Sequence, residues 1–172
     1  MAHGHKHRKA YQQRADLTGE HAVSDIGQLV LACLFAATWI ADSFFKYTTA
    51  LNHYVPLVIR IPLAVVLLSV SAYLARTGMS IVFGETRDEP GVIKTGVFGV
   101  VRHPIYLSEM LLYLGLLMLS ISLAATVVWC IAIVFLHYIS RWEEKLLLAR
   151  FGEEYAQYMR DVPMWIPRLR KR

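Results

Sequence analysis

Apolar segments of membrane-spanning length alternate with shorter polar segments along this chain. Residues 26–45 and 54–75 are each close to the roughly 20 residues that a helix needs to cross a bilayer core. Residues 105–140 stay apolar for thirty-six positions, and one straight helix of that length would overshoot the bilayer. We therefore expect two helices there, in a hairpin that turns near residues 120–122. The pattern predicts an all-α polytopic membrane protein with four transmembrane helices.

The polar segments divide the chain around these helices. Residues 1–25 predict a basic tail, and residues 26–172 predict a single membrane domain. The chain from residue 141 onward is charged and amphipathic, so we expect no further span there.

The second apolar segment contains Pro56, Arg60 and Pro62, which predict a kinked or interfacial first half. Arg60 either extends to the lipid headgroups or faces a polar cavity, and we favour the first interpretation.

Composition and charge support a membrane protein and predict its orientation. Of the 172 residues, 56% are hydrophobic, and the mean hydropathy of +0.41 is high for a soluble domain. Four spans put both termini on one side, where sixteen of the eighteen Lys and Arg residues also fall. The positive-inside rule then places both termini in the cytoplasm. We expect the lipid bilayer, and no nucleic acid, as a partner.

The sequence gives little support for disulfides or a metal site. Cys33 and Cys130 both lie in apolar segments, which favours packing roles. His3, His5 and His7 alternate in the tail, where a metal site and a basic tail that contacts anionic lipid are both open. We favour the basic tail. A cleaved signal peptide fits poorly, because a long polar stretch precedes the first apolar segment.

Arg102 and His103 lie side by side directly before Pro104, where the third apolar segment begins. Proline suits the first helical position, and the residue before a proline disfavours the helical conformation. We therefore expect both side chains on an extended loop at a helix start, whose free N–H groups favour an anion. Two interpretations stay open: a pocket for the carboxylate or phosphate group of a soluble cofactor, and a basic loop that anchors the helix to lipid headgroups.

Glu143 and Glu144 follow the fourth apolar segment, where the helix is expected to leave the membrane. These paired carboxylates either hold a cationic group or hydroxyl groups, or form a solvated helix face paired with neighbouring basic residues such as Arg141. Further along, Gly152 predicts a helix stop or bend, and residues 162–168 predict a cap folded back on the protein.

These motifs keep a set order and spacing over about residues 90–167, nearly half of the chain. They comprise Gly96, Phe98, Arg102, His103, Pro104, Tyr106, the hairpin, Glu143, Glu144, Phe151, Gly152, Glu153, Glu154, Tyr155, Tyr158, Val162 and Pro163. In this order they resemble the isoprenylcysteine carboxyl methyltransferase family, whose wider group includes the phospholipid N-methyltransferases.

The resemblance implies an integral-membrane enzyme that transfers a methyl group from S-adenosylmethionine to a lipophilic acceptor at the cytoplasmic face. Residues 90–167 would form its cofactor-binding part. Carried over by position, the cofactor contacts would be Val92, Ile93, Phe98, His103, Pro104, Ile105, Tyr106 and Glu143. Catalytic roles would fall to Arg102 on the cofactor's carboxylate, to Arg141 steering an anionic acceptor, and to Glu144.

The chain departs from the family pattern at three positions. Pro90 and Phe98 stand where the family often has His and Tyr, which would remove polar contacts to the cofactor. Ile139 stands where members that act on the prenylcysteine carboxylate tend to carry Arg, and Arg141 follows two residues later. Arg141 would face the same pocket only if the helix ended or unwound near Ser140.

Other functions remain open on the same residues. The acceptor could be a phospholipid amine or a small thiol. Membrane sterol reductases have a similar Arg-His-Pro-x-Tyr-x-x-Glu pattern, which Glu109 completes here, so NADPH-dependent reduction is a second possibility. A non-enzymatic membrane protein with a degenerate pocket is a third.

Overall fold

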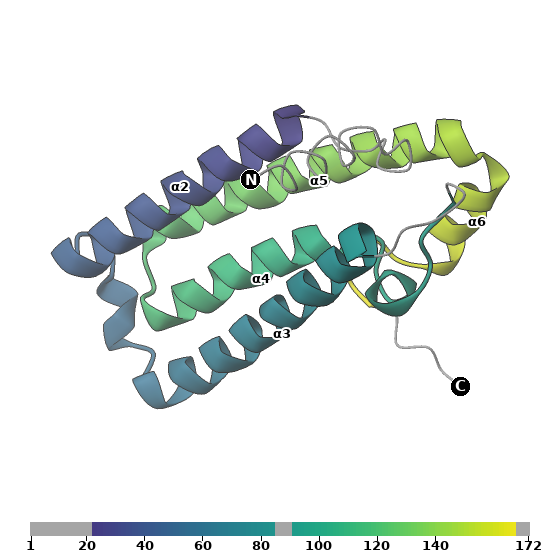
Figure 1. Ribbon diagram of the computed structural model, residues 1–172. Helices are drawn as coiled ribbons and strands as arrows, with labels where there is room; N and C mark the ends of the chain where they lie inside the picture. The colour runs from purple at the N-terminus through teal and green to yellow at the C-terminus, as the bar shows by residue number, and fades with distance from the viewer. Residues whose placement is uncertain (1–21, 85–90, 168–172) are drawn as a thin grey trace, which may run out of the picture.

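The computed structural model describes residues 22–84 and 91–167 (Figure 1). Nearly all of the predicted basic tail lies outside these ranges, including the histidines for which a metal site was considered. Pro90, one of the departures from the family pattern, also lies outside them.

Helices are the regular secondary structure of the described part of the chain, which contains no strand, as predicted. Its helices are α2 (Ala22–Phe45), η1 (Ala50–His53), α3 (Leu57–Gly84), η2 (Gly96–Gly99), α4 (Pro104–Leu119), α5 (Leu123–Phe151) and α6 (Glu153–Asp161). The four helices α2 to α5 lie alongside one another, and α6 folds back from the end of α5 (Figure 1). The structure is therefore a helical bundle with a short C-terminal helix at one end.

Three of the described helices are long and apolar enough to cross a membrane: Ser24–Phe45, Leu57–Phe83 and Leu123–Phe151. Helix α4 is apolar but has only 16 residues, so it is about 24 Å long. A typical hydrocarbon core is about 30 Å thick. Three of the four predicted spans therefore meet the length criterion, and the fourth crossing stays a prediction.

The predicted hairpin is present, with α4 ending at Leu119 and α5 beginning at Leu123. Ser122 caps α5, because its hydroxyl accepts a 3.0 Å hydrogen bond from the backbone N–H of Ala125. Three residues, Ser120, Ile121 and Ser122, form the turn that the apolar pattern could only place approximately. Thr48 and Asn52, before α3, accept hydrogen bonds from backbone N–H groups of this connection and of the start of α5.

The favoured interpretation of Arg60 was wrong. Arg60 is 4% exposed, and its guanidinium donates to the carbonyl oxygens of Met118, at 2.8 Å, and Leu119. The last carbonyls of a helix have no intrahelical donor, and a cation near that end is favoured by the helix dipole. Arg60 therefore caps the end of α4 inside the protein and does not extend to the lipid headgroups.

Helix α3 is longer than predicted. The sequence placed its end at Ala75, before the charged Arg76, but the helix continues to Gly84. Arginine is a good helix former, so a charge can end an apolar run without ending the helix. The extra turns carry Met79, Val82 and Phe83 to the same end of the bundle as the start of α4.

Close helix packing depends on small residues. Helices α3 and α4 pack most extensively, and a Cβ at Gly115 would lie 2.8 Å from the side chain of Leu68. Helix α2 packs on α5, and there Gly27 lies under the ring of Phe135. Small residues at helix interfaces are typical of membrane bundles, where the lipid provides no hydrophobic driving force between helices.

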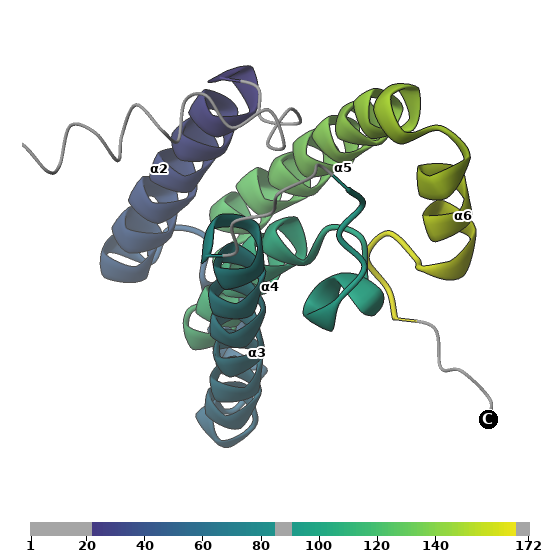
Figure 2. The same cartoon turned by 45° about the vertical axis from the view of Figure 1, so that its right-hand side comes forward.

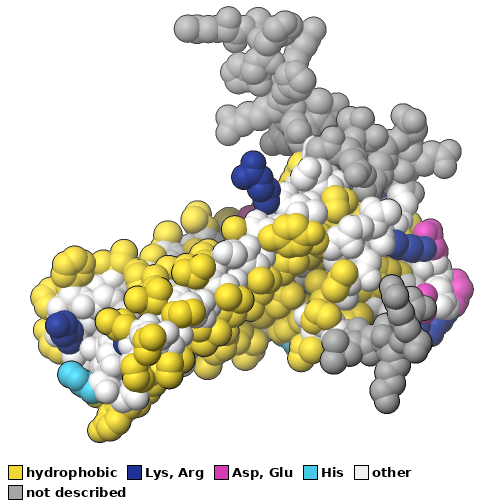
Figure 3. All heavy atoms as spheres, turned by 90° about the horizontal axis from the view of Figure 1, so that it is seen from below, with side chains coloured by type: hydrophobic (Ala, Val, Ile, Leu, Met, Phe, Trp, Pro, Cys, Tyr) yellow, Lys and Arg dark blue, Asp and Glu magenta, His cyan; other side chains and the backbone are white. Residues whose placement is uncertain are grey.

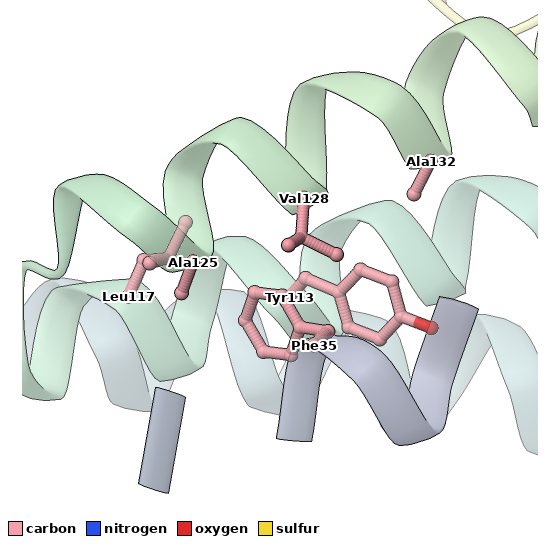
Figure 4. Packing of buried hydrophobic residues seen from close by; sticks show 6 residues of the cluster. All are labelled: Phe35, Tyr113, Leu117, Ala125, Val128 and Ala132. Carbon is pink, nitrogen blue, oxygen red and sulfur yellow. The ribbon is translucent and has the colours of Figure 1, made fainter. Parts of the chain in front are cut away.

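The core of the bundle lies between α2, α4 and α5. The rings of Phe35 and Tyr113 stack there, with centroids 4.3 Å apart, against Val128 and Ala132 (Figure 4). The outside of the bundle is also apolar: Figure 3 shows hydrophobic side chains along most of the visible length, with acidic side chains at one end. Such a surface suits contact with lipid.

Candidate active site

The start of α4 has the geometry that Pro104 predicts. His103 has φ −122° and ψ 64°, which is not helical, and Pro104 occupies the first turn of α4. The loop before it returns to the bundle through η2, where Gly96 has φ +58° and lies against Ile81 of α3. A residue with a Cβ would be strained at that φ and would approach Ile81 to 2.8 Å. Glycine therefore lets the loop close over the end of α3.

The C-terminal segment folds back onto this loop, as predicted. Gly152, with φ +53°, ends α5 and directs the chain into α6. The backbone N–H groups of Arg102 and His103 then donate to the carbonyls of Pro163, at 2.9 Å, and Met164, at 3.3 Å. Figure 2 shows η2, α6 and the end of α5 gathered at one end of the bundle.

A cavity of about 570 Å³ lies at this end of the bundle. Its volume is within the usual range of small-molecule sites, roughly 300–1,000 Å³. All eight residues predicted to contact the cofactor line it: Val92, Ile93, Phe98, His103, Pro104, Ile105, Tyr106 and Glu143. Residues that are far apart in the sequence therefore meet around one space.

Several other lining residues were not predicted to contact the cofactor, although Phe151, Tyr155 and Tyr158 belong to the family motif. Helix α2 contributes Ser24, Asp25 and Gln28, while α3 contributes Met79, Val82 and Phe83. The later chain adds Leu147, Phe151, Tyr155 and Tyr158. A signal was present on α2, because Ser24 and Gln28 are polar, lie one helical turn apart and open an otherwise apolar helix.

Arg102 lines the cavity, but protein groups already bind all three of its guanidinium nitrogens. Nε and one terminal nitrogen contact Oε1 of Glu144 at 2.8 and 2.7 Å. The other donates to the carbonyls of Met159, at 3.0 Å, and Val162. Arg102 therefore joins the loop, α5 and the C-terminal segment. This arrangement gives the predicted contact with a cofactor carboxylate little support.

Glu144 and Arg141 lie apart from the cavity lining. The side chain of Glu144 is 3% exposed and also approaches Nε2 of His103 at 3.3 Å. Arg141 is exposed and contacts Glu144 at 3.5 Å from outside. Helix α5 continues unbroken past Ser140 to Phe151, so the condition for Arg141 to face the cavity is not met.

Glu143, His103 and Tyr106 form the polar wall of the cavity. Oε2 of Glu143 lies 3.6 Å from Nδ1 of His103, and Oε1 accepts a hydrogen bond from the hydroxyl of Tyr106. The rings of His103 and Tyr106 stack with centroids 5.7 Å apart. From α2, the hydroxyl of Ser24 lies 3.4 Å from that of Tyr106. The network holds one carboxylate and two flat rings in fixed positions.

Two buried tyrosines close the cavity beneath the loop. Burial raises the pKa of both Tyr155 and Tyr158 well above the ordinary value, so both hydroxyls stay protonated at physiological pH. The Tyr158 hydroxyl donates a 2.7 Å hydrogen bond to the carbonyl of Phe98. This bond fixes α6 to the loop that carries Phe98 into the cavity.

Within residues 22–84 and 91–167, no group of three or more His, Cys, Asp and Glu side chains is placed to share a metal ion.

The family model for phospholipid methyltransferase matches residues 51–154. The match includes α3, the loop, α4 and α5, and thus most of the cavity wall. The chain belongs to the phospholipid methyltransferase family. The family predicted from the motif order is therefore confirmed, at the level of the wider group. Helix α2, which contributes Ser24, Asp25 and Gln28 to the cavity, lies outside the match.

Two curated proteins are similar to this family member. Methanethiol S-methyltransferase of Crocosphaera subtropica is 30% identical over 149 residues, which cover 86% of this chain and 50% of that protein. Cobalt-zinc-cadmium resistance protein CzcN of Cupriavidus metallidurans is 33% identical over 84 residues, covering 48% of this chain and 38% of that protein. The matched part of this chain thus spans half or less of each relative's length. No solved structure shows significant similarity to the chain.

Proposed function

We propose that this protein is a membrane enzyme that methylates a lipophilic acceptor at the cytoplasmic face, with S-adenosylmethionine as the methyl donor. The observation that carries the proposal is the cavity beside the Arg102-His103-Pro104 loop. It gathers all eight residues that the family resemblance assigns to the cofactor, in a chain of a methyltransferase family. The similarity to a methanethiol S-methyltransferase supports the same reaction type.

The groups around the cavity fit the parts of S-adenosylmethionine. Glu143 can accept hydrogen bonds from ribose hydroxyls or from the ammonium group. Phe98 and Tyr106 offer aromatic faces to the adenine or to the sulfonium. The first turn of α4 leaves backbone N–H groups without intrahelical acceptors, and Ile105 and Tyr106 of that turn line the cavity. These N–H groups suit the carboxylate better than Arg102, whose nitrogens are already bound.

When bound, S-adenosylmethionine supplies an electrophilic methyl group on a sulfonium. The residues of this chain would align the reacting atoms and keep water away, which is much of what such a displacement requires. His103 and Tyr106, stacked and fixed to Glu143, provide a rigid polar wall. Val92, Ile93 and other apolar side chains provide the water-excluding walls.

We also propose that α4 crosses the membrane as a fourth span, with both termini in the cytoplasm. Sixteen of the eighteen Lys and Arg residues then lie on the cytoplasmic side or at the cavity end. The first turn of α4 borders the cavity, so this helix can begin below the membrane surface and needs less length than its neighbours. The acceptor would reach the cavity from the bilayer, and the donor would reach it from the cytosol.

Cysteine labelling in sealed vesicles tests this topology. Tyr47 is 81% exposed in the connection between α2 and α3, and Gln157 is exposed on α6. In a background without Cys33 and Cys130, we expect Tyr47→Cys and Gln157→Cys to react with impermeant reagents from opposite sides. Labelling of both from the same side would contradict the four-span arrangement.

The activity is tested by methyl transfer in proteoliposomes. Purified protein receives S-adenosylmethionine labelled on the methyl group and is offered a prenylcysteine, phosphatidylethanolamine and an alkyl thiol in separate reactions. We expect label in at least one lipophilic product. Reduction of a membrane substrate with NADPH, without any methyl transfer, would overturn the proposal in favour of a reductase.

A further inference from the structure

Helix α4 carries a carboxylate that the proposed cofactor site does not use. Glu109 is partly buried in the apolar helix, one turn beyond Tyr106. Its Oε1 accepts a 2.5 Å hydrogen bond from the hydroxyl of Tyr113. In the described part of the chain this neutral hydroxyl is the one hydrogen-bond partner of Glu109, and no Lys, Arg or His side chain forms an ion pair with it. An ionisable side chain within a membrane helix is costly and usually has a function.

Glu109 lies on the face of α4 that meets α2. Tyr106, Glu109 and Tyr113 are three and seven residues apart, so they share one side of the helix. Tyr106 contacts Ser24 of α2, and Tyr113 stacks on Phe35 of α2 (Figure 4). Glu109 lies between these two contact points. It therefore faces the space between the two helices rather than the lipid side of α4.

On its α2 side the cavity reaches the level of this carboxylate, while the residues of α4 that line it are Pro104, Ile105 and Tyr106. Its α2 wall continues from Ser24 to Gln28, about 6 Å deeper along the helix. From Tyr106 to Glu109 the distance along α4 is similar, about 4.5 Å. Gln28, which lines the membrane end of the cavity, and Glu109, which lies outside that lining, are thus at nearly the same depth on facing helices. A lipophilic acceptor that arrives from the bilayer would pass this level before it reaches the polar wall.

The charged side chains around the cavity disfavour an acceptor that carries a carboxylate. The guanidinium of Arg102 is bound by Glu144 and two carbonyls, and Arg141 lies outside the cavity. The other charged lining residues, Asp25 and Glu143, are acidic. A carboxylate acceptor would therefore meet negative charge without an available cation, whereas an ammonium or a thiol would not.

From this arrangement we propose that Glu109 is the general base for an acceptor whose reacting atom carries a proton, an amine nitrogen or a thiol sulfur. The inference rests on the proposed methyl transfer. The lone pair of nitrogen or sulfur forms the bond to the methyl carbon, while the bond from that carbon to the sulfonium sulfur breaks and leaves its electron pair on sulfur. The acceptor's proton passes to the carboxylate of Glu109. A carboxylate acceptor would need no such base.

Ligand binding to the wild-type protein gives a first test that needs no variant and no turnover. In detergent, dodecylammonium, dodecanol and dodecanoate share one chain length and differ in charge. We expect dodecylammonium to bind at least tenfold more tightly than dodecanoate, with Glu109→Gln weakening the ammonium and sparing dodecanol. Glu153→Gln, at an exposed carboxylate on α6, is the matched control and should change neither. Tighter binding of dodecanoate would overturn the proposal.

The pH dependence of methyl transfer gives the second test. With dodecanethiol and, separately, phosphatidylethanolamine as acceptors, we expect Glu109→Gln to lower kcat/KM at neutral pH by about a hundredfold or more. The affinity for S-adenosylmethionine should change less than twofold. The deficit should shrink as pH rises, because the acceptor then loses its proton without a base. The two acceptors distinguish a thiol from a lipid amine as the source of the proton.

The outcomes separate this inference from the proposed function. Equal kcat/KM in wild type and Glu109→Gln, or a deficit that stays constant with pH, would overturn the role of Glu109 and leave methyl transfer intact. Robust methylation of dodecanoate by the wild-type protein would do the same. Absence of methyl transfer to every acceptor, with no binding of S-adenosylmethionine, would overturn the proposed function itself.

Discussion

Two buried arginines cap opposite ends of this bundle and differ in what surrounds them. At the end where α4 meets α5, Arg60 binds the carbonyls of Met118 and Leu119. At the end where α4 begins, Arg102 also binds two carbonyls, but a buried carboxylate, Glu144, pairs with it. The first arginine completes a helix end. The second fixes three segments around a cavity.

The comparison shows that a buried arginine in a membrane helix bundle does not by itself mark a binding site. Both side chains satisfy backbone carbonyls that would otherwise lack donors. What distinguishes the cavity end is the second layer: His103 and Glu143 project next to the Arg102–Glu144 pair and line the cavity. The following predictions separate the two ends by stability and by ligand affinity.

The largest effect is expected from breaking the pair between Arg102 and Glu144. Their side chains are 8% and 3% exposed, so Arg102→Ala would leave a buried carboxylate with only the longer contacts to His103 and Arg141. Removing one partner of a buried ion pair typically costs about 3–5 kcal/mol. We expect a large drop in thermal stability in detergent together with loss of ligand binding. The double variant Arg102→Met, Glu144→Leu should recover part of the stability, and a fall no greater than that of a surface variant would contradict this account.

Replacing Arg60 should affect stability and leave the cavity unchanged. Arg60→Ala removes two charge-assisted hydrogen bonds at the far end of α4 and should cost about 2–3 kcal/mol. Its affinity for S-adenosylmethionine, measured at a temperature where the variant is folded, should stay within twofold of the wild type. A tenfold loss of affinity would show that the two ends are coupled more strongly than their contacts indicate.

His103 and Glu143 should show the opposite behaviour to Arg60. Each offers a polar group to the cavity, and one lost contact to a charged group typically costs about 1.5–3 kcal/mol, or roughly ten- to hundredfold in affinity. We expect His103→Ala and Glu143→Ala to weaken S-adenosylmethionine binding by this amount, measured by equilibrium dialysis. Glu153→Ala, on the exposed face of α6, should have little effect. Equal effects at Glu143 and Glu153 would refute the assignment.

The smallest effect is expected at Tyr158. Tyr158→Phe keeps the buried ring and removes only the hydrogen bond to the carbonyl of Phe98. One such neutral bond contributes about 1 kcal/mol. We expect a small loss of stability and a several-fold loss of cofactor affinity, because the loop that positions Phe98 loosens. An unchanged affinity would show that α6 supports the fold but does not position the loop.

The sequence predicted features that depend on local pattern. The lengths of the apolar segments predicted helices α2 to α5 and the hairpin between α4 and α5. Pro104 predicted the start of α4, and Gly152 predicted the bend after α5. Motif order placed eight residues that the structure finds around one cavity. The helix start and the bend were predictable because each depends on residues that are close in the sequence. That the eight residues contact a cofactor stays a prediction.

Features that depend on contacts between distant segments were not predictable in the same way. The partner of Arg102 is 42 residues away, and the carbonyls bound by Arg60 are 58 and 59 residues away. A buried arginine that caps a helix and one that reaches lipid headgroups look alike in an apolar segment. The role predicted for Arg141 depended on a similar feature. Whether α5 unwinds near Ser140 cannot be read from the sequence, and the structure shows that it does not.

The central claim is that the cavity beside the Arg102-His103-Pro104 loop binds S-adenosylmethionine. Ultraviolet cross-linking of labelled S-adenosylmethionine to the purified protein, followed by mass spectrometry of its peptides, tests it most directly. We predict label on peptides that contain residues 92–106 and 143–158, with competition by the demethylated product and none by NADPH. Label confined to other peptides, or competition by NADPH alone, would contradict the claim.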